Sequence, residues 1–518
     1  MENHRLPGGW RLPNRVGFVN CTILTMDAQE ECSALILEGN RIMHVSDSER
    51  ETISKLRTGD MLYDLEGRYI LPGFIDSHAH ISTVGMMEIG VDLSGTNSKE
   101  EAYLRIREKL KSTPRDAWIY ARGWDETLWN GGYLTRDDLD QVSKDRCIVA
   151  VRICGHLATV NTAGLSLIND SLKKYRNYYD SKRGILREDA VGVATKMVYS
   201  SPGMREMGIL LGQKRAITLG VTSVHDIVSK QSIQVYQSLW QDRRLMIRSS
   251  LIVDSADPVS IPESVYTGGD EWMRVAGVKA YMDGSIGART AALHEPYADD
   301  PENGGTLLLS KRRVTAILRG LAPRGVQVCI HAIGDRAIDE VMGAFSGLRP
   351  EVICRIEHAE MISSENIRLA MENEVVLSMQ PNFIGQWGQK GGMYEQRLGK
   401  KRASLMNPLR KIMESGVTLV FGSDCMPIDP LYGIRSTVNA PYASQRLKPI
   451  EALRIYTTAG AALSGESHLK GTISKGKLAD LVILSHNPIK DLANAKVDAT
   501  IINGQIVWTR EHLKKRRV

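Results

Sequence analysis

The chain has no segment long and apolar enough to cross a membrane, and its N-terminus lacks the apolar core of a signal peptide. Its net charge of +6 is small for 518 residues. The only dense basic run, at residues 514–517, could contact nucleic acid or a membrane surface but is more simply a solvated tail. We therefore expect a soluble cytoplasmic protein whose partner is a small-molecule substrate, with neither nucleic acid nor a membrane as a partner.

Cysteine pairs are also missing. The seven cysteines form no Cys-x-x-Cys motif, and several lie in apolar runs, such as Cys329 between Val328 and Ile330. Scattered thiols in apolar surroundings are typical of reduced, buried cysteines in a cytoplasmic protein. With 42% apolar and 24% charged residues, the composition is that of an ordinary globular protein, long enough for more than one domain.

Both ends of the chain are rich in short β-like segments. The candidates are a strand at 18–25, a hairpin at 34–45 that turns at Gly39-Asn40, a strand at 479–484 and a segment at 499–508 divided by Asn503-Gly504. Two β-rich ends around a long centre suggest that they pair with one another. We expect residues 1–70 and 465–518 to form one composite β-sandwich domain.

Between these ends, from residue 71 to 464, strand-like apolar runs alternate with helical stretches. This alternation indicates a parallel α/β architecture. The candidate strands are 73–78, 221–226, 247–253, 275–282, 326–331, 353–358, 375–380 and 419–423. Eight strands is the number of a (β/α)8 TIM barrel, whose catalytic groups lie at the C-terminal ends of the strands.

The segment between the first two candidate strands, about 92–219, is too long for an ordinary barrel connection. We therefore expect an insertion there. Because it emerges from the catalytic end of the barrel, it could form a lid or a substrate wall. Structural elaboration explains it equally well, and the sequence leaves both interpretations open.

Chemically versatile side chains follow the expected strand ends. The first strand ends in His78-Ala-His80, and both imidazoles project from one face because side chains repeat every second residue along a strand. The other strand-end residues are Lys279, His331, His358 and Asp424. Neighbouring imidazoles suit a divalent metal such as zinc, whereas a single histidine at a strand end is more often a hydrogen-bonded core residue. Their gathering at one end favours a metal site.

Two of these residues have competing interpretations. Asp424 could cap a helix, or it could bind a metal and accept a proton from metal-bound water. Lys279 has no lone pair while it is protonated, so its simplest role is a salt bridge, for example with Asp283. Carboxylation by CO2 would instead turn Lys279 into an anionic carbamate that could bridge two metal ions.

The pattern of these residues resembles the amidohydrolase superfamily, specifically the amidohydrolase-3 family of YtcJ-like metal-dependent hydrolases. The resemblance covers nearly the whole chain. It rests on the residues 71–80, 279–290, 331–339, 357–360, 422–424 and 471–484. It implies a (β/α)8 barrel with a metal centre and an insertion that shapes the substrate pocket.

The resemblance also assigns roles to the site residues. His78, His80 and Asp424 would hold the more buried metal, and His331 and His358 a second one. Lys279, as N6-carboxylysine, would bridge the two. The expected cofactor is a divalent metal, with zinc the first choice and one or two ions per subunit. A hydroxide between the metals would attack the substrate carbonyl, and Asp424 would act as the catalytic proton shuttle.

Other residues are weaker candidates. Arg289, His156 and Trp124 could bind the substrate, although a structural ion pair explains Arg289 equally well. His225 lies at the end of an expected strand and could support the metal ligands, with its neighbour Asp226 orienting it.

The expected reaction is hydrolysis of a non-peptide carbon–nitrogen bond in an amide, an N-formyl or N-acyl compound or a cyclic amide. A deaminase is an alternative, although deaminases of the superfamily usually lack the lysine that stands here at Lys279. An esterase or lactonase would use the same chemistry. A non-catalytic scaffold is disfavoured because all six metal positions are occupied by suitable residues. The substrate and the oligomeric state, a homo-oligomer included, stay open.

Overall fold

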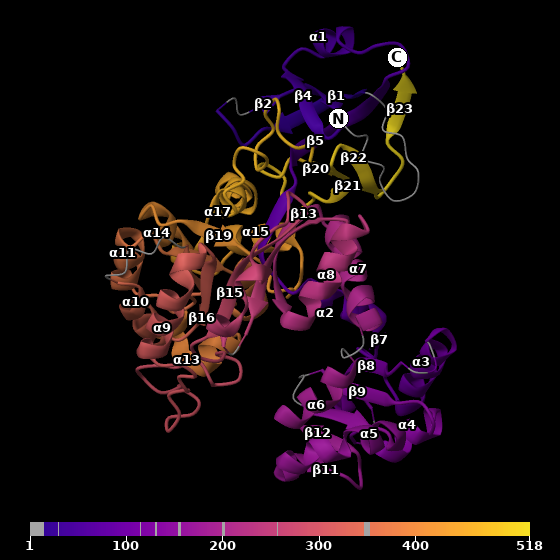
Figure 1. The fold of residues 1–518 in the computed structure, drawn as a ribbon, viewed down its shortest axis with the longest axis vertical. Helices are drawn as coiled ribbons and strands as arrows, with labels where there is room; N and C mark the ends of the chain where they lie inside the picture. The colour runs from indigo at the N-terminus through magenta and orange to yellow at the C-terminus, as the bar shows by residue number, and fades with distance from the viewer. Residues whose placement is uncertain are drawn as a thin grey trace. The chain divides into compact units, whose positions relative to one another are not determined.

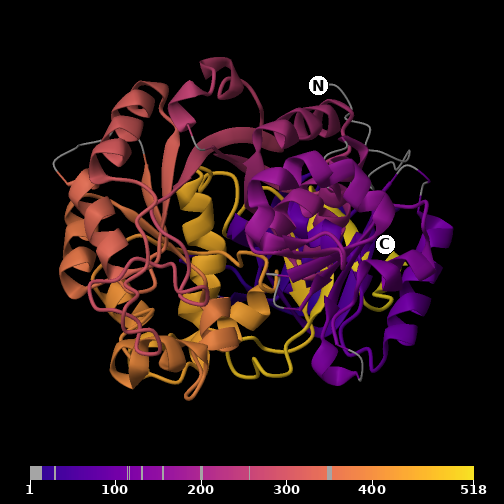
Figure 2. The same cartoon turned by 90° about the horizontal axis from the view of Figure 1, so that it is seen from below.

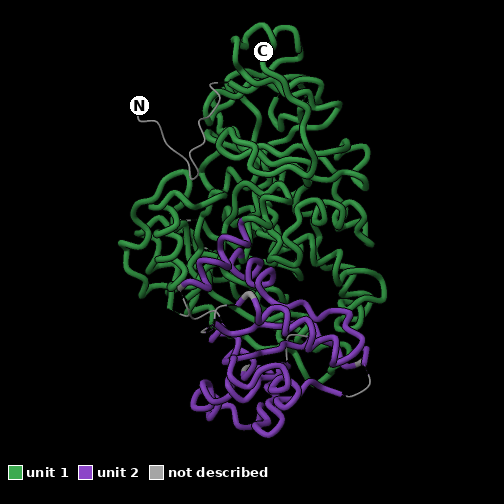
Figure 3. Tube along the Cα trace, turned by 90° about the vertical axis from the view of Figure 1, so that its right-hand side faces the viewer, with its two compact units in different colours: residues 1–80, 214–518 green, residues 81–213 purple. Residues whose placement is uncertain are grey.

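The computed structural model describes residues 15–518 except 29–30, 114, 116, 130–131, 154–156, 199–201, 256 and 347–352 (Figure 1). The chain divides into two compact units (Figure 3). One comprises Met1–His80 and Lys214–Val518, and the other comprises Ile81–Gln213. Of the helices in the described part of the chain, none has both the length and the apolar character needed to span a bilayer.

The two ends of the chain meet in one mixed sheet, as predicted. Its nine strands are β1 (Arg15–Leu24), β2 (Glu31–Cys32), β3 (Ala34–Glu38), β4 (Arg41–Ser46), β5 (Met61–Pro72), β20 (Leu481–Leu484), β21 (Val497–Ile502), β22 (Gln505–Thr509) and β23 (Lys514–Arg517). The long strand β5 joins the two ends, since it pairs with β1 in parallel and with β20 and β23 in antiparallel fashion. Hydrogen bonds join all nine strands of this predicted composite β domain into one continuous sheet.

Turn chemistry and alternating burial explain these strands. β3 and β4 are joined at Gly39-Asn40, and β21 and β22 at Asn503-Gly504. Gly39, Asn503 and Gly504 have the left-handed backbone that Asn and Gly tolerate. One face of the sheet buries a core to which both chain ends contribute, including Phe18, Ile70 and Ile483. This shared core couples the folding of the N-terminal segment to that of the C-terminal segment.

The second sheet is the predicted barrel. Its strands are β6 (Phe74–Ala79), β13 (Val221–Ser229), β14 (Arg248–Asp254), β15 (Met273–Tyr281), β16 (Gln327–Ala332), β17 (Cys354–His358), β18 (Val376–Met379) and β19 (Leu419–Phe421). All are parallel and neighbour one another in sequence order. Each of the eight expected strands is therefore confirmed, with its ends displaced by a few residues.

Helices cover the outside of the barrel strands (Figure 2). They include α8 (Lys230–Gln241), α9 (Lys311–Leu321), α10 (Asp335–Phe345), α11 (Ser364–Glu372), α14 (Leu409–Glu414), α15 (Pro430–Val438), α16 (Pro449–Arg454) and α17 (Gly460–Leu463). α12 (Pro381–Trp387) and α13 (Met393–Ala403) follow β18 and pack on segments at the strand ends. With helices outside and side chains filling the inside, the barrel strands are buried on both faces, and every residue of β6 and β17 is buried. A charged residue within such a strand therefore needs a buried polar partner, either inside the barrel or in the elements that cover it.

The insertion folds as a unit of its own. Its six-stranded sheet contains β7 (Val91–Asp92), β8 (Ile119–Trp124), β9 (Ile148–Arg152), β10 (Leu157–Val160), β11 (Tyr179–Asp180) and β12 (Ile185–Arg187). Its helices include α2 (Ile81–Ile89), α3 (Lys99–Ser112), α4 (Arg136–Val142), α5 (Thr162–Leu172), α6 (Asp189–Val198) and the start of α7 (Pro202–Thr218). Alternate residues of β9 enter two separate cores, with Ile148 and Ala150 in one and Val149 and Val151 in the other.

This unit begins at Ile81, directly after His80, whereas the sequence suggested a start near residue 92. The difference arises from α2, which packs closely against α7. A Cβ atom added at Gly85 would lie 1.7 Å from the carbonyl oxygen of Gly208, so only glycine allows this approach. The sequence around residue 81 gives no sign of this pairing.

Candidate metal centre

The turn after β19 is joined tightly to the end of β6. The Oδ1 atom of Asp76 accepts hydrogen bonds from the backbone N–H groups of His78 (3.1 Å) and Ser423 (3.0 Å). The N–H of Asp424 donates to the carbonyl oxygen of His78 at 2.8 Å. A Cβ at Gly422 would lie 2.4 Å from the Cβ of His78, which explains the glycine. These contacts bring Asp424 to the two histidines.

The backbone at this point is conformationally unusual. Asp424, Cys425 and His358 have φ values of 48°, 62° and 74°, in the left-handed region that side-chain-bearing residues rarely adopt. Such residues cost about 1–3 kcal/mol each and cluster at functional sites. Cys425 also accepts a hydrogen bond from the N–H of His80 at 2.9 Å, which holds the second histidine in place.

His78, His80 and Asp424 form a compact cluster of potential metal ligands. One ligand atom from each lies within 4.8 Å of the others. The Oδ1 atom of Asp424 is 3.0 Å from Nε2 of His80 and 3.6 Å from Nε2 of His78. His78 is fully buried, whereas the side chain of His80 is 28% exposed, so the cluster is open to solvent on one side only.

Lys279 reaches this cluster from β15. Its side chain is buried, and its Nζ atom lies 3.1 Å from Nε2 of His78. It does not pair with Asp283, whose carboxylate accepts the backbone N–H groups of Ala292, Ile333 and Gly334. Burial lowers the pKa of Lys279, although nearby carboxylates oppose this effect. The structure therefore places the lysine against a candidate metal ligand and not in the salt bridge that was its simplest interpretation.

His331 and His358 complete the group. Their ring centroids are 4.5 Å apart, and the His358 ring is 4.9 Å from that of His78. Nε2 of His331 lies 2.9 Å from the carbonyl oxygen of Gly284, to which it donates, so its Nδ1 atom is left as the acceptor nitrogen. The Nδ1 atom of His358 is buried and has no hydrogen-bond partner among the described residues. The structure thus brings together all six residues expected at the strand ends.

Electrostatic effects keep four of these side chains in their metal-binding forms. Burial, reinforced by the positive charge of Lys279, lowers the pKa of His78 to about 4 and that of His331 to about 3. Burial also lowers the pKa of His358 well below its usual value. For Asp424 burial acts to raise the pKa, but the hydrogen bond with His80 and the neighbouring imidazoles outweigh it and hold the pKa below its usual range. The imidazoles of His78, His331 and His358 are therefore held neutral near the carboxylate of Asp424.

These donors fit a divalent transition metal. Zinc prefers imidazole nitrogen and carboxylate oxygen, and both have to be unprotonated to bind. A buried polar atom usually has a hydrogen-bond partner, so the unpartnered Nδ1 of His358 is an available metal donor. His78 is suited in a further way, because its Nδ1 is engaged elsewhere and its Nε2 faces the cluster.

Sequence reasoning overlooked two important residues of β17. Glu357 lies with its Oε2 atom 2.5 Å from Nδ1 of His78, and its Oε1 atom is 2.8 Å from Nε of Arg355. A signal was present, because two opposite charges at alternate positions of an apolar strand have to share a buried face. Their contact with His78, on β6, could not be read from the sequence.

Two of the weaker candidates, Arg289 and Trp124, have structural contacts of their own. The Arg289 guanidinium pairs with both carboxylate oxygens of Asp299, at 2.9 and 3.1 Å, as a structural ion pair would. Trp124 is fully buried in the core of the insertion, and its indole N–H donates to the carbonyl oxygen of Ala150, so it offers no surface to a substrate. His156 lies outside the described residues.

His225 is buried inside the barrel, where its ring nitrogens face Arg355 and Ser464. Asp226 does not orient it, contrary to expectation, since the Asp226 carboxylate accepts a hydrogen bond from the hydroxyl of Tyr236 at 2.6 Å. Consecutive residues of a strand point to opposite faces, which explains why the two side chains do not meet.

A parallel eight-stranded barrel with histidines and an aspartate gathered at the ends of its strands is the architecture of a metal-dependent enzyme. The chain belongs to the amidohydrolase family, whose family model matches residues 62–508. It is 29% identical to the putative amidohydrolase YtcJ of Bacillus subtilis, over 86% of this chain and 90% of that protein. It is 24% identical to the N-substituted formamide deformylase of Arthrobacter pascens, over 95% and 98% of the two chains.

A solved structure shows the same fold. An uncharacterized metal-dependent hydrolase from Pyrococcus furiosus superposes with a TM-score of 0.82 at 30% identity, over 92% of this chain and all of that one. An uncharacterized metal-dependent hydrolase from Pyrococcus horikoshii superposes with a TM-score of 0.80 at 29% identity. These likenesses extend over both compact units, and they agree with the family resemblance of the sequence.

Proposed function

We propose that the protein hydrolyses a non-peptide carbon–nitrogen bond in a small amide, an N-formyl or N-acyl compound or a cyclic amide. The observation that carries the proposal is the charged carboxylate of Asp424 beside His78 and His80 at the open end of the barrel. The full-length similarity to a formamide deformylase supports this bond type.

Five unmodified side chains would hold the metal. His78, His80 and Asp424 suit one divalent ion, zinc being the expected one, and His331 and His358 suit a second. When bound, such an ion polarises a carbonyl oxygen and lowers the pKa of a coordinated water to about 7.

Asp424 is the proposed proton carrier. Its carboxylate stays ionised because the hydrogen bond with His80 and the neighbouring imidazoles offset the effect of burial on its pKa. It can therefore accept a proton from the attacking water as the new C–O bond forms. Since an amine is far more basic than a carboxylate, the proton passes on to the leaving nitrogen as the C–N bond breaks.

Lys279 is the proposed bridge between two ions. Its buried amine has a lowered pKa, so more of it is unprotonated at neutral pH than for an exposed lysine. The neutral amine adds to CO2 to give a carbamate anion and a proton. The carbamate would supply oxygen donors beside His78, where the unmodified ammonium would repel a cation.

The alternatives to hydrolysis of a carbon–nitrogen bond are less well supported. A deaminase of this superfamily usually lacks a lysine at the position of Lys279. Ester or lactone hydrolysis needs the same attack on a carbonyl carbon and is distinguished by the leaving group alone. A scaffold without activity would have no need for six suitable metal ligands.

A turnover screen tests the proposal. Zinc-loaded protein is supplied with N-formyl, N-acyl and cyclic amides, with esters and lactones of matched acyl groups, and with ring amines. We expect release of an amine or ring opening from at least one amide class, and loss of this activity after chelation and its return with zinc. Turnover confined to esters, lactones or ring amines, or zinc-independent turnover, would contradict the proposal.

A further inference from the structure

A buried ion pair lies within the barrel beside the candidate metal centre. Arg355 and Glu357 occupy alternate positions of β17, and both side chains are completely inaccessible to solvent. Oε1 of Glu357 contacts Nε of Arg355 at 2.8 Å, and Oε2 lies 2.5 Å from Nδ1 of His78. One carboxylate therefore joins the arginine to a candidate metal ligand.

The Arg355 guanidinium that contacts this carboxylate is itself held from several sides. Its Nη1 atom contacts Nδ1 of His225 at 3.1 Å and donates to Oε1 of Gln327 at 3.2 Å. Its Nη2 atom donates to the carbonyl oxygen of Ser77 at 2.8 Å and to the hydroxyl of Ser378 at 3.1 Å. These partners come from β13, β16, β6 and β18, so one rigid guanidinium connects five barrel strands.

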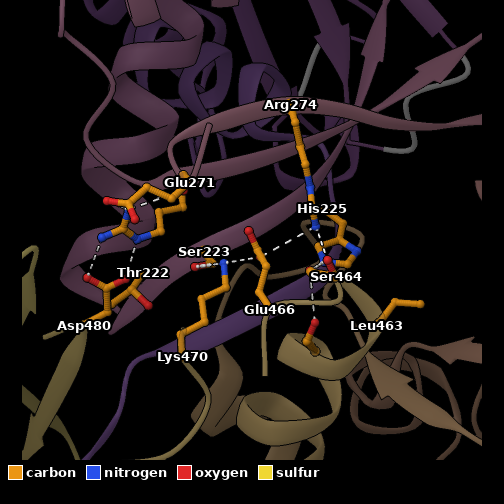
Figure 4. A network of polar contacts seen from close by, with 12 residues as sticks. Thr222, Ser223, His225, Glu271, Arg274, Leu463, Ser464, Glu466, Lys470 and Asp480 are labelled. Carbon is orange, nitrogen blue, oxygen red and sulfur yellow. Dashed lines mark hydrogen bonds and ion pairs between the residues drawn. The ribbon is translucent and has the colours of Figure 1, made fainter. Parts of the chain in front are cut away.

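The chain of contacts continues away from the metal centre through His225. Because Arg355 can only donate, Nδ1 of His225 is the acceptor and its Nε2 carries the proton that goes to the hydroxyl of Ser464, 2.7 Å away. The carbonyl oxygen of Ser464 also accepts a hydrogen bond from the guanidinium of Arg274, as Figure 4 shows. The interior network is therefore anchored in the segment that follows α17.

From these contacts we propose that Glu357, held by Arg355, is a positioning residue for the metal centre. As acceptor of the Nδ1 proton of His78, it fixes the ring orientation and leaves Nε2 as the nitrogen that faces Lys279 and Asp424. A carboxylate in this place also makes the imidazole a stronger donor. The proposal rests on the metal-dependent function proposed above and assigns a role to a residue that does not itself bind the metal.

A second buried ion pair provides a matched control. Arg248 and Asp480 are 2.6 Å apart, and each side chain is only 2% exposed. Arg248 also pairs with Glu271, and Figure 4 shows Asp480 and Glu271 in this polar network. In the described part of the chain, neither Arg248 nor Asp480 contacts any of the six strand-end residues. Neutralising Asp480 therefore removes the same kind of interaction without affecting His78 directly.

The experiment compares the variants Glu357→Gln, Glu357→Asp and Asp480→Asn in the full-length protein. Zinc affinity is measured by competition with a chelator, and the ligand field is measured from the visible absorption of the cobalt-loaded protein. We expect Glu357→Gln to weaken zinc binding about 10- to 100-fold and to alter the cobalt spectrum. Asp480→Asn should leave both unchanged even if its melting temperature falls.

Glu357→Asp keeps a charge beside Arg355 but withdraws it from His78, so it should fold and still lose zinc affinity. Unchanged zinc affinity in both Glu357 variants would overturn the proposal, as would an equal loss in Asp480→Asn, which would indicate general destabilisation. Neither readout needs a substrate. The positioning role can therefore hold while amide hydrolysis fails, or fail while amide hydrolysis holds.

Discussion

Replacing Asp424 by asparagine should reduce turnover of the amide substrate roughly 100- to 10,000-fold, the range that a general acid–base group contributes. Asparagine keeps the shape of the side chain and its turn, but it cannot take up the proton from water or pass it to the leaving nitrogen. It also removes the anionic donor that lies 3.0 Å from Nε2 of His80, so zinc affinity should fall as well. The measurements are kcat and kcat/KM at saturating zinc, with the metal content of each sample.

A matched control lies five residues further along the same turn. Asp429 caps α15 through a hydrogen bond from the N–H of Tyr432, and asparagine is an equally good cap. Asp429→Asn should retain both activity and zinc. Full activity of Asp424→Asn would contradict the assigned proton transfer, and equal losses in the two variants would point to disruption of the turn as a whole.

Lys279→Ala should lose metal and nearly all activity. If a carbamate on Lys279 bridges two ions, its removal deletes an oxygen donor from each, and the site should then hold fewer ions. Short carboxylic acids such as formate or acetate should partly restore both metal content and turnover, because they supply the missing oxygen donors. Metal content per chain, measured with and without the acid, reports this directly.

Lys470 provides the control for the effect of removing any buried lysine. It is also buried, but its Nζ atom pairs with Glu466 at 2.9 Å and with the hydroxyl of Ser223 at 3.0 Å, away from the metal centre. Lys470→Met should lower stability without changing metal content or responding to carboxylic acids. Full metal content and full activity in Lys279→Ala would rule out the bridging role.

Much of the fold was predictable because its signals are local. Each barrel strand is an apolar run, and the parallel arrangement places every strand end on one side, so His331 and His358 could be expected near His78 before their distances were known. The composite sheet was predictable for a similar reason, since the Gly39-Asn40 and Asn503-Gly504 turns mark hairpins at both chain ends.

What could not be predicted depends on contacts between distant segments. Glu357 stands next to a candidate ligand in the sequence, but its contact with His78 joins residues 279 positions apart. Trp124 was a candidate for substrate binding, whereas the inserted sheet buries it against Trp129. The start of the insertion at Ile81 depends on the approach of Gly85 to Gly208. None of these contacts has a signature in the local sequence.

The most direct test of the metal centre is anomalous X-ray diffraction from crystals of the zinc-loaded protein. We predict a zinc peak among Nε2 of His78, Nε2 of His80 and the carboxylate of Asp424, at about 2.0–2.2 Å from each donor atom. Zinc bound only elsewhere, or these three side chains arranged as they are with no zinc between them at saturating concentration, would contradict the assignment of the site.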